Sequence, residues 1–196
     1  MIEFVDIWDE EGSPTGEKCT KQFAHEKGLF HPTVHVWFYT SDHNILMQKR
    51  GSKKQTYPNF WDVSVAGHLS SGETIHQGAI REIKEEIGLT ILHNDLEFIT
   101  IRKNVNKFSS GIIDCEFQHV FLAKLTTKID NLNIQKEEID DVRLFSFDEI
   151  IECQNFKNSN YKIVPADMTY YSYIIDIISK EINLKVPKIN IFNKFN

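Results

Sequence analysis

Residues 67–89 read GHLSSGETIHQGAIREIKEEIGL, and this stretch decides the fold and the chemistry expected of the chain. Apolar residues recur in it at helical spacing, which predicts an amphipathic helix over 73–87. Gly88 follows at the position where a helix commonly ends in a left-handed glycine. The apolar stripe consists of Ile75, Ala79, Ile80, Ile83 and Ile87. One face of this helix is therefore expected to pack against a hydrophobic core.

Three carboxylates gather along one edge of that helix. Glu82, Glu85 and Glu86 are three and four residues apart, so their side chains lie within reach of one another. Like charges this close repel, and a divalent cation such as Mg²⁺ or Mn²⁺ would remove the repulsion. A solvated charged face, partly neutralised by Arg81 and Lys84, is the alternative interpretation, and the commoner one for such a pattern in isolation.

The composition is that of an acidic globular protein. Of 196 residues, 41% are hydrophobic and 26% are charged, and the formal net charge is -6. These values exclude a disordered or fibrous chain. They also argue against nucleic-acid binding, which needs a basic surface. A small phosphorylated ligand needs only two or three local cations and stays compatible with this charge.

Signals for export or membrane insertion are missing from the sequence. The first residues, MIEFVDIWDEEG, are acidic and lack the apolar core of a signal peptide. The three cysteines are far apart and form no CxxC pair. No apolar run reaches the roughly 18 residues that a membrane span requires. We therefore expect a cytoplasmic protein with reduced thiols and no membrane partner.

Short apolar runs and turn signals on both sides of 67–89 predict a mixed sheet. The expected strands are 33–40, 45–49, 61–66, 96–103, 112–125 and 142–145, of which the first two form a hairpin. Further helices are expected after Ser146, with Glu149 completing a capping box, and over 165–184. The tail from residue 185 carries no clear signal.

These elements predict an α/β fold in a single domain. The domain is expected to span 1–196, with its core at about 30–150 and a C-terminal helix at about 165–184. The segment that holds His25 and His31 is expected to be irregular. An exposed strand or the C-terminal tail offers a surface for a possible homodimer.

The stretch 67–89 also resembles the signature of the Nudix hydrolases, and every position of that signature matches. The matching residues are Gly67, Glu73, Arg81, Glu82, Ile83, Glu85, Glu86, Gly88 and Leu89. The resemblance implies an α/β/α sandwich with a mixed sheet and a small-molecule diphosphate as substrate. It further implies a Mg²⁺ or Mn²⁺ site made by the three glutamates of the helix and the backbone carbonyl near Gly67. Glu73, Arg81 and Gly88 would support this motif structurally.

A wider resemblance, from about Glu3 to Glu149, is to the branch of that superfamily that includes isopentenyl-diphosphate isomerase. It is carried by residues 25–31 (HEKGLFH), 48–61 (QKRGSKKQTYPNFW) and 64–68 (SVAGH). The isomerases join three histidines and two acidic residues in a metal site. The positions that match that site here are His25, His31, His68, Asp114 and Glu116. Arg50 and Lys54 match the residues that hold the diphosphate.

One departure separates this chain from the isomerases. They carry a catalytic cysteine where this sequence has Ala66, and an alanine cannot transfer a proton to or from carbon. We therefore expect Mg²⁺-dependent hydrolysis of a diphosphate linkage instead. The resemblance to this branch, which includes such hydrolases, implies a nucleoside diphosphate or related nucleotide as the substrate. One of the glutamates, Glu82, Glu85, Glu86 or Glu116, would accept the proton of the attacking water.

Three other functions stay open at this point. The first is isomerisation of isopentenyl diphosphate. The second is ligand binding without catalysis, against which the intact REIKEE segment argues. The third is hydrolysis of a nucleotide-sugar or a dinucleoside polyphosphate. Glu137 and Glu138 lie in a loop that supplies a general base in some Nudix hydrolases, although acidic loops are usually only solvated.

Overall fold

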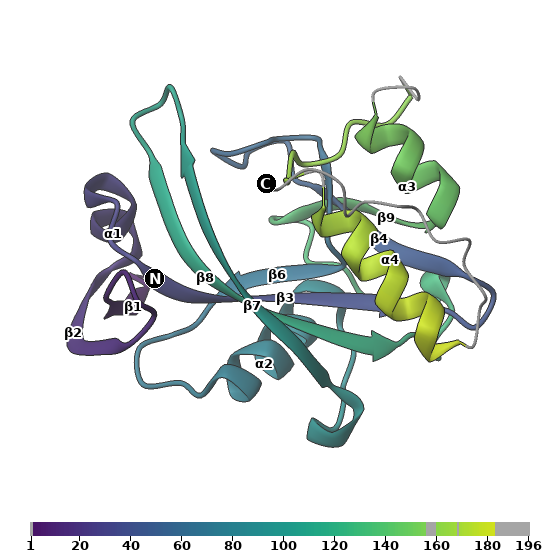
Figure 1. The fold of residues 1–196 in the computed structure, drawn as a ribbon, viewed down its shortest axis with the longest axis horizontal. Helices are drawn as coiled ribbons and strands as arrows, with labels where there is room; N and C mark the ends of the chain where they lie inside the picture. The colour runs from purple at the N-terminus through teal and green to yellow at the C-terminus, as the bar shows by residue number, and fades with distance from the viewer. Residues whose placement is uncertain (1, 156–159, 168, 183–196) are drawn as a thin grey trace, which may run out of the picture.

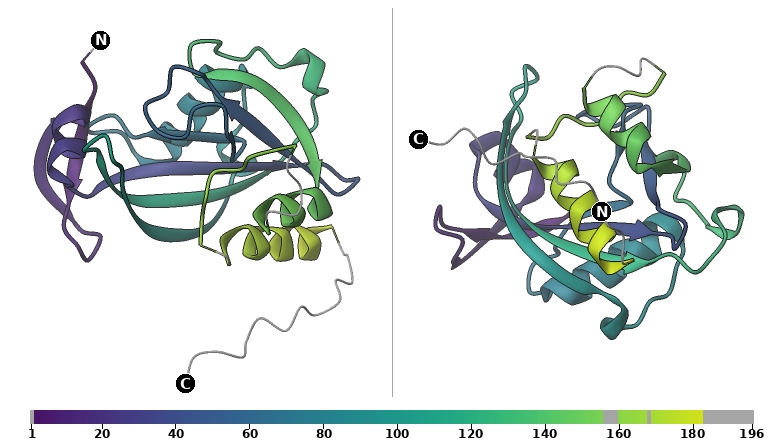
Figure 2. Two further views of the ribbon diagram at one scale, coloured as in Figure 1. Left: turned by 90° about the horizontal axis from the view of Figure 1, so that it is seen from above. Right: turned by 45° about the vertical axis from the view of Figure 1, so that its right-hand side comes forward.

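The main body of the protein is a mixed sheet held between helices. In the computed structural model, which describes residues 2–155, 160–167 and 169–182, five strands run in the order β5-β4-β3-β8-β7, β6 also pairs with β3, and β9 with β4. Helix α2 covers one face of the sheet, and α3 and α4 cover the other (Figures 1 and 2). The expected α/β/α sandwich is confirmed.

The strands of this sheet have the following bounds: β3 His31–Tyr39, β4 Asn44–Arg50, β5 Trp61–Asp62, β6 Val65–His68, β7 Glu97–Lys107, β8 Ile113–Lys124 and β9 Ile139–Ser146. The helices are α1 Lys21–Lys27, α2 Ile75–Ile87, α3 Phe147–Gln154 and α4 Tyr170–Glu181. Short 3₁₀ turns span His93–Asp95 and Ile129–Asn131. No helix of the described residues has the length and apolarity needed to cross a bilayer.

The central strand β3 explains the two-sided packing. Its successive side chains point to opposite faces of the sheet. Val34, Val36 and Phe38 pack in the cluster that includes the apolar stripe of α2. Trp37 points the other way, into the cluster that α3 and α4 complete. A strand buried on both faces reads as a continuous apolar run, which is why 33–40 was recognisable in the sequence.

Helix α2 begins two residues later than expected. Thr74 is its N-cap and forms a capping box with Gln77, and Gly88 ends it in the left-handed conformation with φ 74°. The expected capping box of Ser146 and Glu149 is present at the start of α3. Local signals thus located both helices correctly to within one or two residues.

The expectation of an irregular segment around His25 was wrong. Residues 21–27 form helix α1, which Thr20 caps at its start and Gly28 ends at φ 64°. Helix α1 packs on a separate two-stranded sheet, β1 Phe4–Trp8 with β2 Pro14–Thr20. This N-terminal unit lies at one end of the main sheet (Figure 1). Helix α1 has only 7 residues, which is too short for an apolar periodicity to be recognised in the sequence.

The expected strand at 61–66 is in fact two strands in different places. Trp61–Asp62 pairs with β4, whereas Val65–His68 pairs with β3. Between them, the buried Ser64 hydroxyl accepts a hydrogen bond from the Phe38 amide and donates one to the Leu46 carbonyl. This side chain bridges the diverging strands and lets the chain cross from one to the other.

The C-terminal helix is shorter than expected. It begins at Tyr170 rather than 165, and residues 162–164 before it run extended beside β5. There the Trp61 amide donates to the Lys162 carbonyl, and the Val164 amide donates to the Trp61 carbonyl. Residues 183 and 184 of the expected helix, and the tail from 185, lie outside the described residues. The 33–49 hairpin is confirmed at its tip, where Tyr39 pairs with Ile45.

Candidate active site

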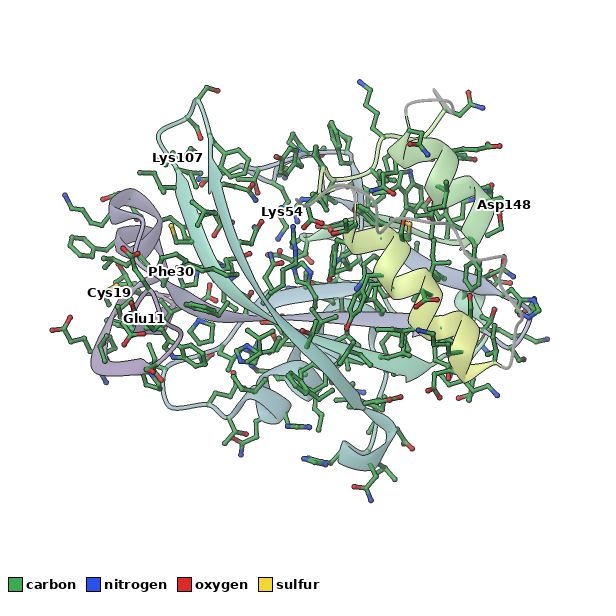
Figure 3. All side chains as sticks on the ribbon, viewed as in Figure 1. Glu11, Cys19, Phe30, Lys54, Lys107 and Asp148 are labelled. Atoms are coloured by element: carbon green, nitrogen blue, oxygen red, sulfur yellow. The ribbon has the colours of Figure 1, made fainter. Side chains whose placement is uncertain are left out.

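A cavity of about 1220 Å³ lies where the N-terminal unit, the main sheet and α2 meet. Most residues singled out in the sequence line it. They are His25, Arg50, Lys54, Gly67, His68, Arg81, Glu82, Glu85, Glu86, Asp114 and Glu116. His31, Glu73 and Gly88 are not on its surface but contact residues that are, or end the helix that carries them. Lys54 is labelled in Figure 3, which shows the side chains around it.

The glutamates of α2 differ in burial. Glu82 and Glu86 are only 9% and 5% exposed, whereas the Glu85 side chain is half-exposed. Glu86 accepts hydrogen bonds from the Gln48 amide (3.1 Å) and the Ala66 backbone N–H (3.2 Å). Burial, and next the charge of Glu82, raise the pKa of Glu86 to about 8. Burial also raises the pKa of Glu82. Two buried carboxyl groups thus face the same cavity, where burial disfavours the charged form of each.

Arg81 holds the group together. Its guanidinium donates to both carboxylate oxygens of Glu73, each at 2.9 Å, to Glu82 at 2.8 Å and to Glu85 at 2.9 Å. It also donates to the His68 carbonyl at 2.9 Å, which ties α2 to strand β6. Only arginine presents enough donors in a fixed plane to satisfy this many acceptors. Glu82 and Glu85 are therefore oriented before any ligand binds.

Glycine is required at position 67 because strand β6 passes very close to the Glu82 side chain of α2, and not because of its backbone conformation. A Cβ at this position would lie 2.1 Å from the carboxyl carbon of Glu82. Only glycine lets strand β6 come this near to the helix, so the Gly67 carbonyl and the α2 carboxylates line one end of the cavity.

Three histidines and an aspartate form a second cluster beside the glutamates. His25, His31, His68 and Asp114 come from α1, β3, β6 and β8, and each offers one ligand atom within 4.8 Å of the others. The His25 and His68 Nε2 atoms are 3.2 Å apart, and Asp114 Oδ1 lies 3.6 Å from His25 Nε2 and 3.9 Å from His31 Nε2. Glu116 Oε1 lies 3.8 Å from His68 Nε2.

Burial keeps the imidazoles of this cluster uncharged, which is the form that binds a cation, and the Asp114 carboxyl would release its proton to a bound ion. Burial lowers the pKa of His25 to about 4, and burial followed by the charge of Glu116 raises the pKa of Asp114 to about 8. His31 Nδ1 lies 2.8 Å from the Leu29 carbonyl, which fixes the proton on that nitrogen and leaves Nε2 as an electron-pair donor. Neither His31 Nε2 nor Asp114 Oδ1 has a hydrogen-bond partner within the described residues, although both are buried. Two orphaned donor atoms facing neutral imidazoles are the arrangement that a divalent metal ion satisfies.

Arg50 and Lys54, the two residues expected to bind the diphosphate, lie on the cavity wall, and each is paired with an acidic residue of the protein. Arg50 donates to Asp62 at 2.9 Å and to the Thr56 carbonyl and hydroxyl, each at 3.0 Å. Lys54 pairs with Glu138 in the acidic loop. Burial, followed by the charge of Arg50, lowers the pKa of Lys54.

Several cavity residues were not anticipated from the sequence. Lys21 lies one turn before His25 on α1, and Gln118 donates to Glu116 at 2.6 Å. Arg102, Asn104 and Asn106 line the cavity from β7. The expected strand ended at residue 103, whereas β7 continues to Lys107. The alternation of polar residues over 102–106 was the one signal that could have revealed this extension and these side chains.

Comparison with known proteins agrees with this geometry. The sequence model of the NUDIX domain matches residues 29–167. This chain belongs to the Nudix family. It is therefore a Nudix-type enzyme, and such hydrolases act on small molecules that contain a diphosphate, generally with a divalent metal ion such as Mg²⁺.

Two relatives and one solved structure illustrate the similarity. An uncharacterised Nudix hydrolase of Clostridium acetobutylicum is 38% identical over 151 residues, which cover 76% of this chain and 72% of that protein. The isopentenyl-diphosphate Delta-isomerase of Pectobacterium atrosepticum is 30% identical over 148 residues, covering 76% and 79%. A protein of Deinococcus radiodurans, known from a crystal structure, shares the fold with a TM-score of 0.65 at 16% identity. The superposition covers 87% of this chain and 98% of that one. The resemblance to Nudix hydrolases and to the isomerases is thus confirmed.

Proposed function

We propose that this Nudix enzyme hydrolyses the diphosphate linkage of a nucleoside diphosphate or a related nucleotide, with Mg²⁺ or Mn²⁺ held by Glu82 and Glu86. The observation that carries the proposal is the burial of these two carboxylates side by side on one cavity. Burying two adjacent negative charges is unfavourable unless a cation compensates them. Glu85 and the Gly67 carbonyl stand at the edge of the same group.

A bound divalent ion would neutralise charge on the diphosphate oxygens and make water more acidic. The residues around it have separate tasks. Arg81 keeps the α2 carboxylates in place through its bonds to Glu82 and Glu85. Lys54 and Arg50 would hold the terminal phosphate, with Lys54 exchanging its Glu138 partner for a phosphate oxygen.

The proton of the attacking water needs an acceptor on the cavity wall. Glu116 suits this task because Gln118 binds one of its oxygens at 2.6 Å, while the other faces His68 at 3.8 Å. A glutamate of α2 is the other candidate, of which Glu85 is half-exposed. His25, His31, His68 and Asp114 would hold a second cation beside this base.

Isomerase chemistry is disfavoured by Ala66. The methyl group of this residue lines the cavity at the position where the isomerases carry their cysteine, and it has no proton to exchange. Cys115 does not replace it, because its side chain lies on the face of β8 turned away from the cavity, 3.7 Å from where a Cβ on Gly28 would stand. Hydrolysis of a diphosphate needs no proton-transferring side chain at position 66.

The deciding experiment measures phosphate and nucleotide release from a panel of diphosphates with and without Mg²⁺. The panel holds nucleoside diphosphates, nucleotide-sugars, a dinucleoside polyphosphate and isopentenyl diphosphate. Release from nucleotides that requires Mg²⁺ and falls at least about a hundredfold in E86Q supports the proposal. The matched control is K84Q, on the exposed side of the same helix, which should retain full activity.

Two results would overturn the proposal. Isomerisation of isopentenyl diphosphate without release of phosphate from any compound would assign the isomerase function. Binding of nucleotides that is unaffected by E86Q, without turnover of any compound, would assign a ligand-binding module.

A further inference from the structure

Strand β7 presents a polar row to the cavity directly opposite the acidic residues of β8. In the antiparallel pair of these strands, Asn104 stands opposite Glu116, and Asn106 stands opposite Asp114. Directly paired residues on neighbouring strands extend to the same face of the sheet, about 5 Å apart. Both asparagines line the cavity, as do both acidic residues. The two carboxamides therefore lie immediately beside the proposed catalytic groups.

The asparagine side chains are free to bind a ligand. Among the hydrogen bonds of the described residues, none involves the carboxamide of Asn104 or Asn106, although both residues are half-buried. Arg102, in the same row, is fully engaged by contrast. It donates to Asp167 at 3.0 Å and to Gln118 at 2.7 Å, and its guanidinium lies 4.5 Å from the centre of the Tyr170 ring.

The alternation of β7 is inverted relative to an ordinary half-buried strand. Arg102, Asn104 and Asn106 point toward the cavity, whereas Ile101 and Val105 lie with two lysines on the outer face and are 49% and 48% exposed. Packing alone favours the opposite arrangement, with apolar residues inside. Among the described residues, the Asn104 and Asn106 amides have no protein partner that would explain this arrangement. A ligand with complementary polar groups explains it.

The chemistry of a carboxamide narrows that ligand. Asparagine offers two N–H donors and a carbonyl acceptor, so it pairs best with groups that both donate and accept, such as hydroxyls and nucleobase edges. Phosphate oxygens only accept, and the cavity already provides Arg50 and Lys54 for them. A hydrocarbon chain would leave the amides desolvated and unpaired, which is unfavourable.

We infer that Asn104 and Asn106 bind the organic group attached to the diphosphate, and that this group is a hydroxyl- or heteroatom-rich moiety, a nucleoside or sugar, instead of a prenyl chain. This inference rests on the proposed function, because it takes the substrate to be a diphosphate in this cavity. It adds two specificity-determining residues that the Nudix signature does not contain.

The test measures binding separately from hydrolysis. Dissociation constants are determined by calorimetry for three compounds that cannot be hydrolysed: α,β-methylene-ADP, isopentenyl methylenediphosphonate and methylenediphosphonate itself, all with Mg²⁺. The wild type should bind α,β-methylene-ADP at least about tenfold more tightly than the isopentenyl compound, since one hydrogen bond accounts for about this factor. N104L and N106L should each reduce affinity for α,β-methylene-ADP about tenfold and leave methylenediphosphonate binding unchanged.

Controls separate recognition from folding. V105T changes the solvent face of the same strand with nearly the same shape and should alter none of the three affinities. N104A and N106A repeat the test with a smaller side chain, in case leucine disturbs the hairpin, and thermal midpoints are measured for every variant.

Three outcomes would overturn the inference. The first is equal wild-type affinity for the nucleotide and isopentenyl compounds. The second is an unchanged nucleotide affinity in all four asparagine variants. The third is an equal loss for all three compounds, which would make the amides supports of Asp114 and Glu116. Lack of phosphate release in the parallel hydrolysis assay would contradict the proposed function alone, because the binding ratios do not depend on turnover.

Discussion

Gly67 and Glu82 face each other without room for a methyl group between them, since a Cβ on Gly67 would lie 2.1 Å from the Glu82 carboxyl carbon. G67A should therefore displace Glu82 from the cavity and weaken Mg²⁺ binding by about ten- to a hundredfold. The Mg²⁺ concentration for half-maximal hydrolysis measures the effect. A66G, which removes a methyl group at the neighbouring position, is the control and should leave that concentration nearly unchanged. An unchanged value in G67A would show that Glu82 does not bind the metal ion.

Lys54 and its neighbour Lys53 provide a matched pair for testing the diphosphate site. Lys54 is on the cavity wall and pairs with Glu138, whereas Lys53 is exposed outside the cavity. K54A should raise KM about tenfold or more, because a charge-assisted hydrogen bond to phosphate is lost. K53A should leave KM within about twofold. Steady-state kinetics on the best nucleotide of the panel gives both values, and equal effects would exclude a specific phosphate contact at Lys54.

The metal-free enzyme should lose stability as the pH rises from 6.5 to 8. Burial raises the pKa of Glu86 and of Asp114 to about 8, from ordinary values near 4. In this interval the folded state therefore holds protons that the unfolded state has released, so the free energy of unfolding falls with rising pH. The expected loss is on the order of 1–2 kcal/mol, or several degrees in thermal midpoint.

Thermal melts in EDTA across that pH interval test this dependence. E86Q should show a smaller slope, since one of the two titrating groups is gone. Saturating Mn²⁺ should abolish or reverse the slope, because the ion stabilises the deprotonated carboxylates. Below pH 6.5 the buried histidines act in the opposite direction: burial lowers the pKa of His25 to about 4, so their protonation favours unfolding. A thermal midpoint in EDTA that rises between pH 6.5 and 8 would contradict the prediction.

D114N should change stability in opposite directions with and without metal. In the metal-free protein, the substitution removes a buried carboxylate next to Glu116 and should raise the thermal midpoint at pH 8. With Mn²⁺, the stabilisation by the ion should shrink, because a ligand of the histidine cluster is lost. Elemental analysis should find about one fewer bound ion per chain. D130N, at an exposed site, should change neither quantity, and an unaltered ion count in D114N would exclude a metal ion at this cluster.

Local sequence patterns located much of the fold correctly. The stripe of apolar residues, the Thr74 cap and Gly88 are all contained in one short stretch, and helix α2 follows from them. Strand β8 and the first part of β7, up to residue 103, were likewise evident from their runs of apolar and β-branched residues, whereas the polar end of β7 was not predicted. In each case the sequence pattern that marks the element is local, although the hydrogen bonds of the strands join distant segments.

Apart from the short helix α1, the errors occurred where distant partners determine the local conformation. The division of 61–66 depends on the Ser64 hydroxyl joining Phe38 and Leu46. The extended segment 162–164 depends on its pairing with β5. Neither contact leaves a periodic trace in the sequence, and neither was predicted.

The candidate site shows the same division. The α2 glutamates were recognised because they share one helix and match a family signature. The proximity of His25 to Asp114 was expected only through the resemblance to the isomerases, since these residues lie on α1 and β8 and are far apart in the chain. Asn104 and Asn106 gained meaning only from the strand register that sets them beside the acidic residues.

The sequence alone therefore determined the family, the helix that carries the three glutamates and the absence of a cysteine at position 66. Helical periodicity and side-chain identity are local properties, and they can be recognised without knowledge of the fold. The tertiary structure decided which side chains share the cavity, which donors stay unpaired and which face of β7 the asparagines occupy. These follow from strand register and from burial, both of which arise only when segments distant in the chain pack together.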